Sequence, residues 1–141
     1  YVLIHTFSHI IMRQLSLESG YGLSDIKERI YFSPDHNMAG LMIYTSGSDS
    51  GGSLGGLVRA IKPGYFENLF RNAIYNSRFC SRDPICYENN QEGLNKLNFA
   101  ACHACCMTSD LACETRSKNS YLDRKTIIGD RNKEHGYFNS F

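Results

Sequence analysis

The chain has 141 residues and a mass of 16.0 kDa, with 42% hydrophobic side chains and 15 basic against 14 acidic residues. This is the size of one domain, and the hydrophobic and aromatic content excludes a disordered tail. The near balance of charge excludes a strongly basic nucleic-acid module, so any contact with nucleic acid has to come from a local patch. The apolar runs are shorter than the ~18 residues that a membrane-spanning helix needs, and we expect no membrane association.

The chain starts with Tyr1, within an apolar pattern. The basic start and the small-residue cleavage site of a secretory signal peptide are missing. We therefore expect residues 1–141 to be a single domain excised from a longer protein.

The first part of the chain predicts a long helix followed by two strands. In residues 1–18, apolar side chains recur at three- and four-residue steps, and Gly20 and Gly22 end the helix. From Ile26 to Phe32, side chains alternate as in a half-buried strand. After turn residues 33–37, residues 41–45 predict a second, more fully buried strand. The two strands are able to pair as an antiparallel hairpin. A longer crossover connection between them is the alternative.

Two further helices are expected before the cysteine-rich part. Ser53 is placed to cap a short helix that Pro63 and Gly64 end, and a second helix runs from about residue 65 to 79. The expected core face of that second helix consists of Phe66, Leu69, Phe70, Ala73 and Ile74. The predicted fold class is α+β, with helices packed on a small sheet in residues 1–79. An irregular, zinc-bound segment at residues 80–125 and a tail at 126–141 follow.

All six cysteines lie between Cys80 and Cys113. A secreted disulfide scaffold spreads its cysteines along the chain, whereas this clustering favours a metal site in a reducing compartment. We therefore expect a cytoplasmic protein that binds zinc.

Zinc takes four ligands in a tetrahedron, and a Cys-x-x-Cys turn supplies two of them. Cys102 and Cys105 fit this turn. The predicted ligands are Cys86, Cys102, Cys105 and Cys113, with Cys80 in reserve. Cys106 is expected to be a packed thiol, and His103 a surface group or a neighbour of the ligands. Buried free thiols or disulfides are the alternatives to a metal site.

His5 and His9 lie four residues apart on the predicted first helix and share a face. Two imidazoles at this spacing can bind a metal, but the glutamate that zinc hydrolases place between them is missing. We expect hydrogen-bonded histidines that line the packed face.

A glycine-rich loop precedes the short helix and is a candidate anion-binding loop, because its backbone amides can approach a ligand. Its candidate residues are Asp49, Gly51, Gly52 and Ser53. Neither a Walker lysine nor a dinucleotide fingerprint is present, so a flexible connection that permits close helix packing is the other interpretation. If His5, His9 and Asp49 converge there, the chain would be an enzyme acting on phosphate or phosphodiester groups.

A late group of basic residues with two tyrosines is the candidate nucleic-acid patch. The group comprises Arg116, Lys118, Arg124, Lys125, Arg131, Lys133, Tyr121 and Tyr137. Acidic residues are interleaved with it, so a solvated face of mixed charge is the alternative.

Several features occur in a characteristic order along nearly the whole chain. They are the helix YVLIHTFSH from Tyr1, the strand LMIYT from Leu41, Asp49 before GGSLGGL, Cys80, DPIC ending at Cys86, ACHAC with Cys102 and Cys105, Cys113-Glu114, and YLDR from Tyr121. This order resembles the C-terminal zinc-binding domain, first catalogued as a domain of unknown function, of MrfA-type DNA-repair helicases and of DrmB-type proteins of the DISARM phage-defence system. The DrmB branch is the more similar of the two.

The resemblance implies a structural zinc bound by cysteines. Cys102, Cys105 and Cys113 match the family's metal motif, and both Cys80 and Cys86 match its upstream part. It also implies an accessory role beside a superfamily 2 helicase, on the same chain or as a separate subunit, in phage defence or DNA repair.

In that role the domain would contact DNA or the helicase. A protein-binding module without nucleic-acid contact is a further alternative. The chain contains no helicase motif, so we expect no catalytic residues and no ATP hydrolysis by this domain.

Overall fold

The computed structural model describes residues 1–45, 55–91, 96–115, 120–130 and 135–140. In these residues helices accompany one two-stranded antiparallel sheet, which confirms the α+β class. The elements in chain order are α1 (Val2–Ser19), β1 (Ile26–Ser33), the 3-10 helix η1 (Pro34–His36), β2 (Met38–Thr45), α2 (Gly55–Ala60), α3 (Tyr65–Ser77), α4 (Ile85–Glu88) and α5 (Lys125–Ile128). Among the described residues, no helix is long and apolar enough to cross a membrane.

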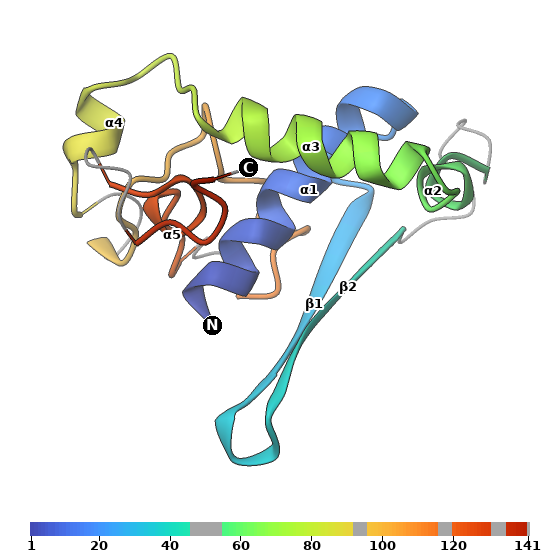
Figure 1. The fold of residues 1–141 in the computed structure, drawn as a ribbon, viewed down its shortest axis with the longest axis horizontal. Helices are drawn as coiled ribbons and strands as arrows, with labels where there is room; N and C mark the ends of the chain where they lie inside the picture. Colours follow the sequence, from blue (N-terminus) through green and yellow to red (C-terminus); the bar gives the residue numbers. More distant parts are fainter. Residues whose placement is uncertain (46–54, 92–95, 116–119, 131–134, 141) are drawn as a thin grey trace.

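Helix α1 is the centre of the molecule. It ends at Gly20, whose φ of 76° is the left-handed conformation that glycine adopts readily, and the Gly20 N–H donates to the Ser16 carbonyl. Ile11, Met12 and Leu15 pack with residues of β1 and α3 in one core cluster, while Ile10 belongs to a second cluster with the cysteine-rich segment. Helix α3 lies across α1, and the hairpin extends away from the helices (Figure 1).

The two strands form the antiparallel hairpin, paired from Ile26 with Thr45 to Ser33 with Met38. Strand β1 buries Ile26, Glu28 and Ile30 in alternation, as predicted, but Phe32, which continues the predicted face, is 43% exposed. The expectation of a more fully buried second strand is wrong, because no residue of β2 is buried. The far part of the hairpin projects beyond the helices (Figure 1), and there Phe32 contacts the ring of Tyr1, with centroids 6.0 Å apart.

Helices α2 and α3 close one side of the first cluster. Leu69, Ala73 and Ile74 of α3 are buried as predicted, but Phe66 is 47% exposed at the start of the helix. Gly56 of α2 lies so near Tyr21 that an added Cβ would be 2.7 Å from the tyrosine ring. Glycine is therefore required there by close packing, as the second interpretation of the glycine-rich stretch proposed. The candidate anion loop itself, Asp49 to Ser53, lies outside the described residues.

The C-terminal third packs on the opposite side of α1 and completes the second core cluster. Cys102, Leu122 and Ile127 are fully or almost fully buried there. Phe138 stacks on Phe7 of α1, with ring centroids 5.7 Å apart. The described part of residues 126–141, expected to be a tail, therefore contributes to the core.

Arg124 is a fully buried cation. Its guanidinium donates to the Asp83 carboxylate at 2.6 Å and to the Ser77 carbonyl at 3.2 Å. Burial alone lowers the pKa of Arg124, but the hydrogen bond to Asp83 and the negative charges of Asp83, Cys105 and Cys106 together outweigh it and raise the pKa above its ordinary value. This residue was assigned to the nucleic-acid patch, and the structure instead uses it to join α3 to the segment after Cys80.

We predict that Arg124→Ala lowers the free energy of unfolding by about 2–4 kcal/mol, because it leaves the Ser77 carbonyl without its donor and empties buried volume. Lys62→Ala, at an exposed position, is the control and is expected to change stability by less than about 0.5 kcal/mol. Urea unfolding curves measure both. Equal midpoints for the two variants would contradict a structural role for Arg124.

Candidate metal centre

Four thiols from three parts of the chain converge on one point. They are Cys80, Cys86, Cys102 and Cys105, whose sulfur atoms all lie within 4.8 Å of one another. Sulfur–sulfur distances are 3.5 Å from Cys80 to Cys102, 3.7 Å from Cys86 to Cys105 and 3.8 Å from Cys102 to Cys105. A tetrahedron with Zn–S bonds of about 2.3 Å has edges of about 3.8 Å. All six cysteines are free thiols, so disulfides do not explain the cluster.

Local backbone geometry presents these thiols. The Cys102 carbonyl accepts the N–H groups of Cys105, at 3.1 Å, and Cys106, at 2.9 Å, which makes the tight knuckle expected from the sequence. The Cys102 N–H donates to the Cys105 sulfur, and the Arg82 N–H to the Cys80 sulfur. Each of these two sulfur atoms thus accepts a backbone hydrogen bond, which favours the thiolate form that a metal requires.

Arg13 of α1 holds the knuckle against the helix. Its guanidinium donates to the carbonyls of His103, Ala104 and Met107, at 3.3, 3.0 and 3.2 Å. Three carbonyls that have no helix or sheet partner are satisfied by one side chain, so the knuckle is fixed relative to α1.

The thiols differ in how readily they ionise. Burial raises the pKa of Cys80 to about 11 and raises that of Cys86 well above its usual range. The hydrogen bond from the Cys106 thiol lowers the pKa of Cys105 to about 5 against the effect of burial, with help from the Arg124 charge. Thiolates packed together in this way need a cation among them, because they otherwise repel one another.

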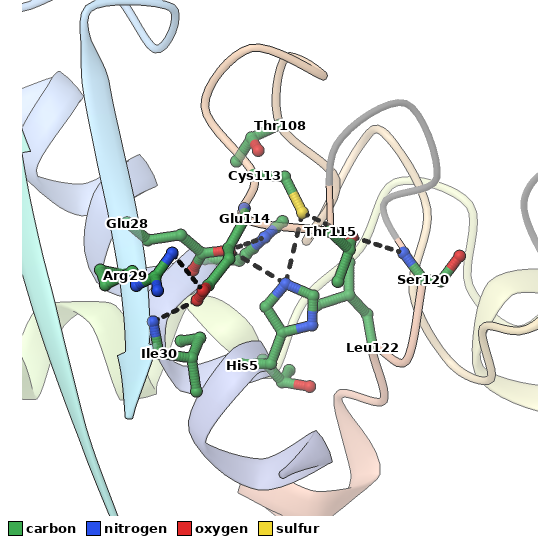
Figure 2. Close-up of polar contacts among 12 residues, drawn as sticks. His5, Glu28, Arg29, Ile30, Thr108, Cys113, Glu114, Thr115, Ser120 and Leu122 are labelled. Atoms are coloured by element: carbon green, nitrogen blue, oxygen red, sulfur yellow. Dashed lines mark hydrogen bonds and ion pairs between the residues drawn. The ribbon is translucent and has the colours of Figure 1, made fainter. Parts of the chain in front are cut away.

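A second group of side chains converges beside α1, about one helical turn from the knuckle. It consists of His5 and His9 of α1, Glu28 of β1 and Cys113, with ligand atoms that also lie within 4.8 Å of one another. Glu28 Oε1 is 3.0 Å from His5 Nε2 and 3.2 Å from His9 Nε2. Figure 2 shows His5 between Glu28 and Cys113, whose sulfur is 3.3 Å from His5 Nε2.

The second group is closed to solvent, since each of its four residues is at most 3% exposed. Burial alone raises the pKa of Glu28, but hydrogen bonds from His5 and His9 outweigh it and hold the pKa well below its usual range. Burial lowers the pKa of His5, and hydrogen bonds with Cys113 and Glu28 more than reverse this. The carboxylate therefore favours positive charge at the centre of the group.

The structure distributes the predicted ligands over two places. Cys86, Cys102 and Cys105 lie together, the reserve residue Cys80 joins them, and Cys113 lies in the second group. Cys106 is buried and belongs to neither group, and His103 is exposed. His5 and His9 share a face and make hydrogen bonds in the packed interior, as expected, and their burial leaves no access for a phosphodiester substrate.

Sequence analysis missed Glu28. The signal was present, because Glu28 alternates in phase with the apolar Ile26 and Ile30 on the buried face of a strand. A carboxylate at such a position requires a buried partner. What the sequence did not show is that this partner comes from α1.

Comparison with known proteins assigns the chain to a protein family. A family model described as the MrfA Zn-binding domain matches residues 7–106. The chain is 44% identical over 128 residues, or 91% of its length, to the DISARM protein DrmB of Bacillus paralicheniformis. It spans 22% of the length of that relative. The four-thiol group lies entirely within the matched residues and fits zinc in donor type and spacing, so zinc is the cofactor. The chain belongs to the MrfA Zn-binding domain family.

Proposed function

We propose that Cys80, Cys86, Cys102 and Cys105 hold a structural zinc. The convergence of the four sulfur atoms supports this ligand set. All four residues lie within the part of the chain that matches the zinc-binding family, whereas Cys113 lies beyond it. Because four thiolates fill a tetrahedral site and leave no open position, the zinc is structural rather than catalytic.

The zinc would fix a segment that has little regular structure of its own. Between Cys80 and Cys113, the described residues form only the four-residue helix α4. The zinc ligands tie the end of α3 and helix α4 to the knuckle that Arg13 holds on α1. Structural zinc contributes on the order of 10 kcal/mol to folding in small metal-dependent domains, which is enough to order such a segment.

At the level of the whole protein, we propose that the domain is a non-catalytic part of a DrmB-like phage-defence protein that works beside a superfamily 2 helicase. The similarity to DISARM DrmB over 91% of the chain supports this role. The free thiols are consistent with the reducing cytoplasm as its location.

The hairpin offers a surface for a protein partner. On one face of it, Tyr31, Met38, Met42 and Tyr44 are each 40–45% exposed. Tyrosine, methionine and arginine are enriched in protein interfaces, and Arg29 lies on the same face. By contrast, Arg124 of the candidate nucleic-acid patch is buried. We therefore favour contact with the helicase, or with the rest of the parent protein, over contact with DNA.

The ligand set predicts the metal content of three variants. Cys105→Ser and Cys80→Ser are each expected to lose one zinc per chain, because three thiolates hold zinc more weakly than four. Cys106→Ser is the matched control, since Cys106 is equally buried but lies outside the ligand group, and it should keep its zinc. Mass spectrometry of the purified proteins gives the zinc content. Unchanged zinc in Cys80→Ser would remove Cys80 from the ligand set.

The proposed partner contact predicts that Met42→Ser weakens binding of the parent protein to its helicase about ten-fold, or ~1.4 kcal/mol. Leu17→Ser is the control, because Leu17 is 76% exposed on α1, outside the hairpin. Binding titrations with the helicase and with single- and double-stranded DNA at two salt concentrations distinguish the partners. Salt-dependent DNA binding together with unchanged helicase affinity in Met42→Ser would favour a nucleic-acid interface instead.

A further inference from the structure

We propose that His5, His9, Glu28 and Cys113 form a second zinc site, separate from the four-thiol site. The four side chains come from α1, from β1 and from the loop after the knuckle, so they meet only in the folded chain. The family match ends at residue 106 and therefore covers His9 and Glu28 but not His5 or Cys113. Two imidazoles, a carboxylate and a thiolate are all ligands that zinc accepts.

The spacing of the donor atoms fits a small tetrahedral site. In a tetrahedron with zinc bonds of about 2.0–2.3 Å, the ligand atoms are about 3.3–3.8 Å apart. His9 Nε2 is 3.2 Å from Glu28 Oε1, and His5 Nε2 is 3.3 Å from the Cys113 sulfur. His5 Nε2 and Glu28 Oε1 are somewhat closer, at 3.0 Å, and all four ligand atoms lie within 4.8 Å of one another, so small shifts of the side chains would bring them to the spacing of a metal shell.

The contacts of His9 leave its Nε2 aimed at Glu28, in a position that a metal ion can occupy. His9 Nδ1 is 2.9 Å from the Cys106 carbonyl, which can only accept, so Nδ1 carries a proton. Nε2 faces Glu28 Oε1 at 3.2 Å, where either a proton, which makes the ring an imidazolium, or a metal ion joins the two atoms. A backbone carbonyl that orients the other ring nitrogen is typical of metal-bound histidine.

The remaining contacts lead to the same conclusion. His5 Nε2 faces both Glu28 Oε1 and the Cys113 sulfur, and its single proton cannot serve both well. In the part of the chain that the structure describes, His5 Nδ1 and Glu28 Oε2 have no hydrogen-bond partner although both are buried. Of these two atoms, Glu28 Oε2 would be satisfied by a metal bound to the carboxylate, and leaving it without a partner is costly in a protein interior.

A Cys-His-Glu catalytic relay does not fit the geometry. Such a relay places the nucleophile on one imidazole nitrogen and the carboxylate on the other. Here Cys113 and Glu28 both contact Nε2 of His5. This arrangement fits three side chains that bind one common metal ion. Full burial of the group also excludes substrate. Four protein donors leave no open position, so this zinc too is structural.

The experiment measures zinc content and zinc–ligand distances in the full-length protein, after loading with excess zinc and gel filtration. X-ray absorption at the zinc edge separates Zn–S bonds of about 2.3 Å from Zn–N and Zn–O bonds of about 2.0–2.2 Å. We expect His9→Gln to lose one zinc per chain and to lose the shorter bonds. In Cys105→Ser the shorter bonds should dominate, because the four-thiol site is then lost.

His36→Gln is the control, since His36 is an exposed histidine on η1 and should leave zinc content and distances unchanged. If His9→Gln does not fold, the X-ray absorption spectrum of the zinc-loaded parent protein alone tests the second site. The proposal requires nitrogen and oxygen ligands in that spectrum. A shell of sulfur only, or unchanged zinc content in a folded His9→Gln variant, overturns the second site. Neither result affects the four-thiol site.

Discussion

The attachment of the cysteine-rich segment to helix α1 is the constraint on which the rest of this structure depends. Between Cys80 and Cys113 the described residues form one short helix, and side chains of α1 bind the carbonyls of the knuckle. Arg13 satisfies the carbonyls of His103, Ala104 and Met107, and His9, one helical turn earlier, donates to the carbonyl of Cys106. One helix thereby fixes the position of the zinc knuckle and, through it, of the segments that supply the other thiols.

The regular part of the fold could be predicted from local pattern. The three- and four-residue spacing of apolar residues in residues 1–18, with Gly20 to end them, is sufficient to define α1. Alternation around Ile30 defines β1. The burial of β2 could not be predicted in the same way, because an apolar run such as residues 41–45 is compatible with a core strand or with an exposed hairpin. Which of the two occurs depends on where the helices end, and that is a tertiary property.

The proposed metal ligands also divide into those that a local pattern predicts and those that it does not. The Cys-x-x-Cys spacing defines Cys102 and Cys105 as a pair because both come from one tight turn. The choice between Cys80 and Cys113 as the fourth member depends on the path of the chain through α4 and the knuckle, which has no periodic signal. Glu28 was recognisable as a misplaced charge on an apolar face, but its partners lie about twenty residues earlier, and only the packing of β1 on α1 brings them together.

The two clusters are mechanically connected. Cys105 belongs to the four-thiol group, its neighbour Cys106 accepts the hydrogen bond from His9, and His9 belongs to the second group. The loop from Met107 to Cys113 then leads from one group to the other, and Glu114 beyond it binds the Ile30 N–H and Arg29 on β1. A displacement of the knuckle therefore has to move the His9 ring or break its hydrogen bond to Cys106. A displacement of Cys113 pulls on the neighbouring Glu114 and on its contacts with β1. Because each cluster restrains the other, the contacts of α1 and of Glu114 together hold the hairpin in position relative to the cysteine-rich segment.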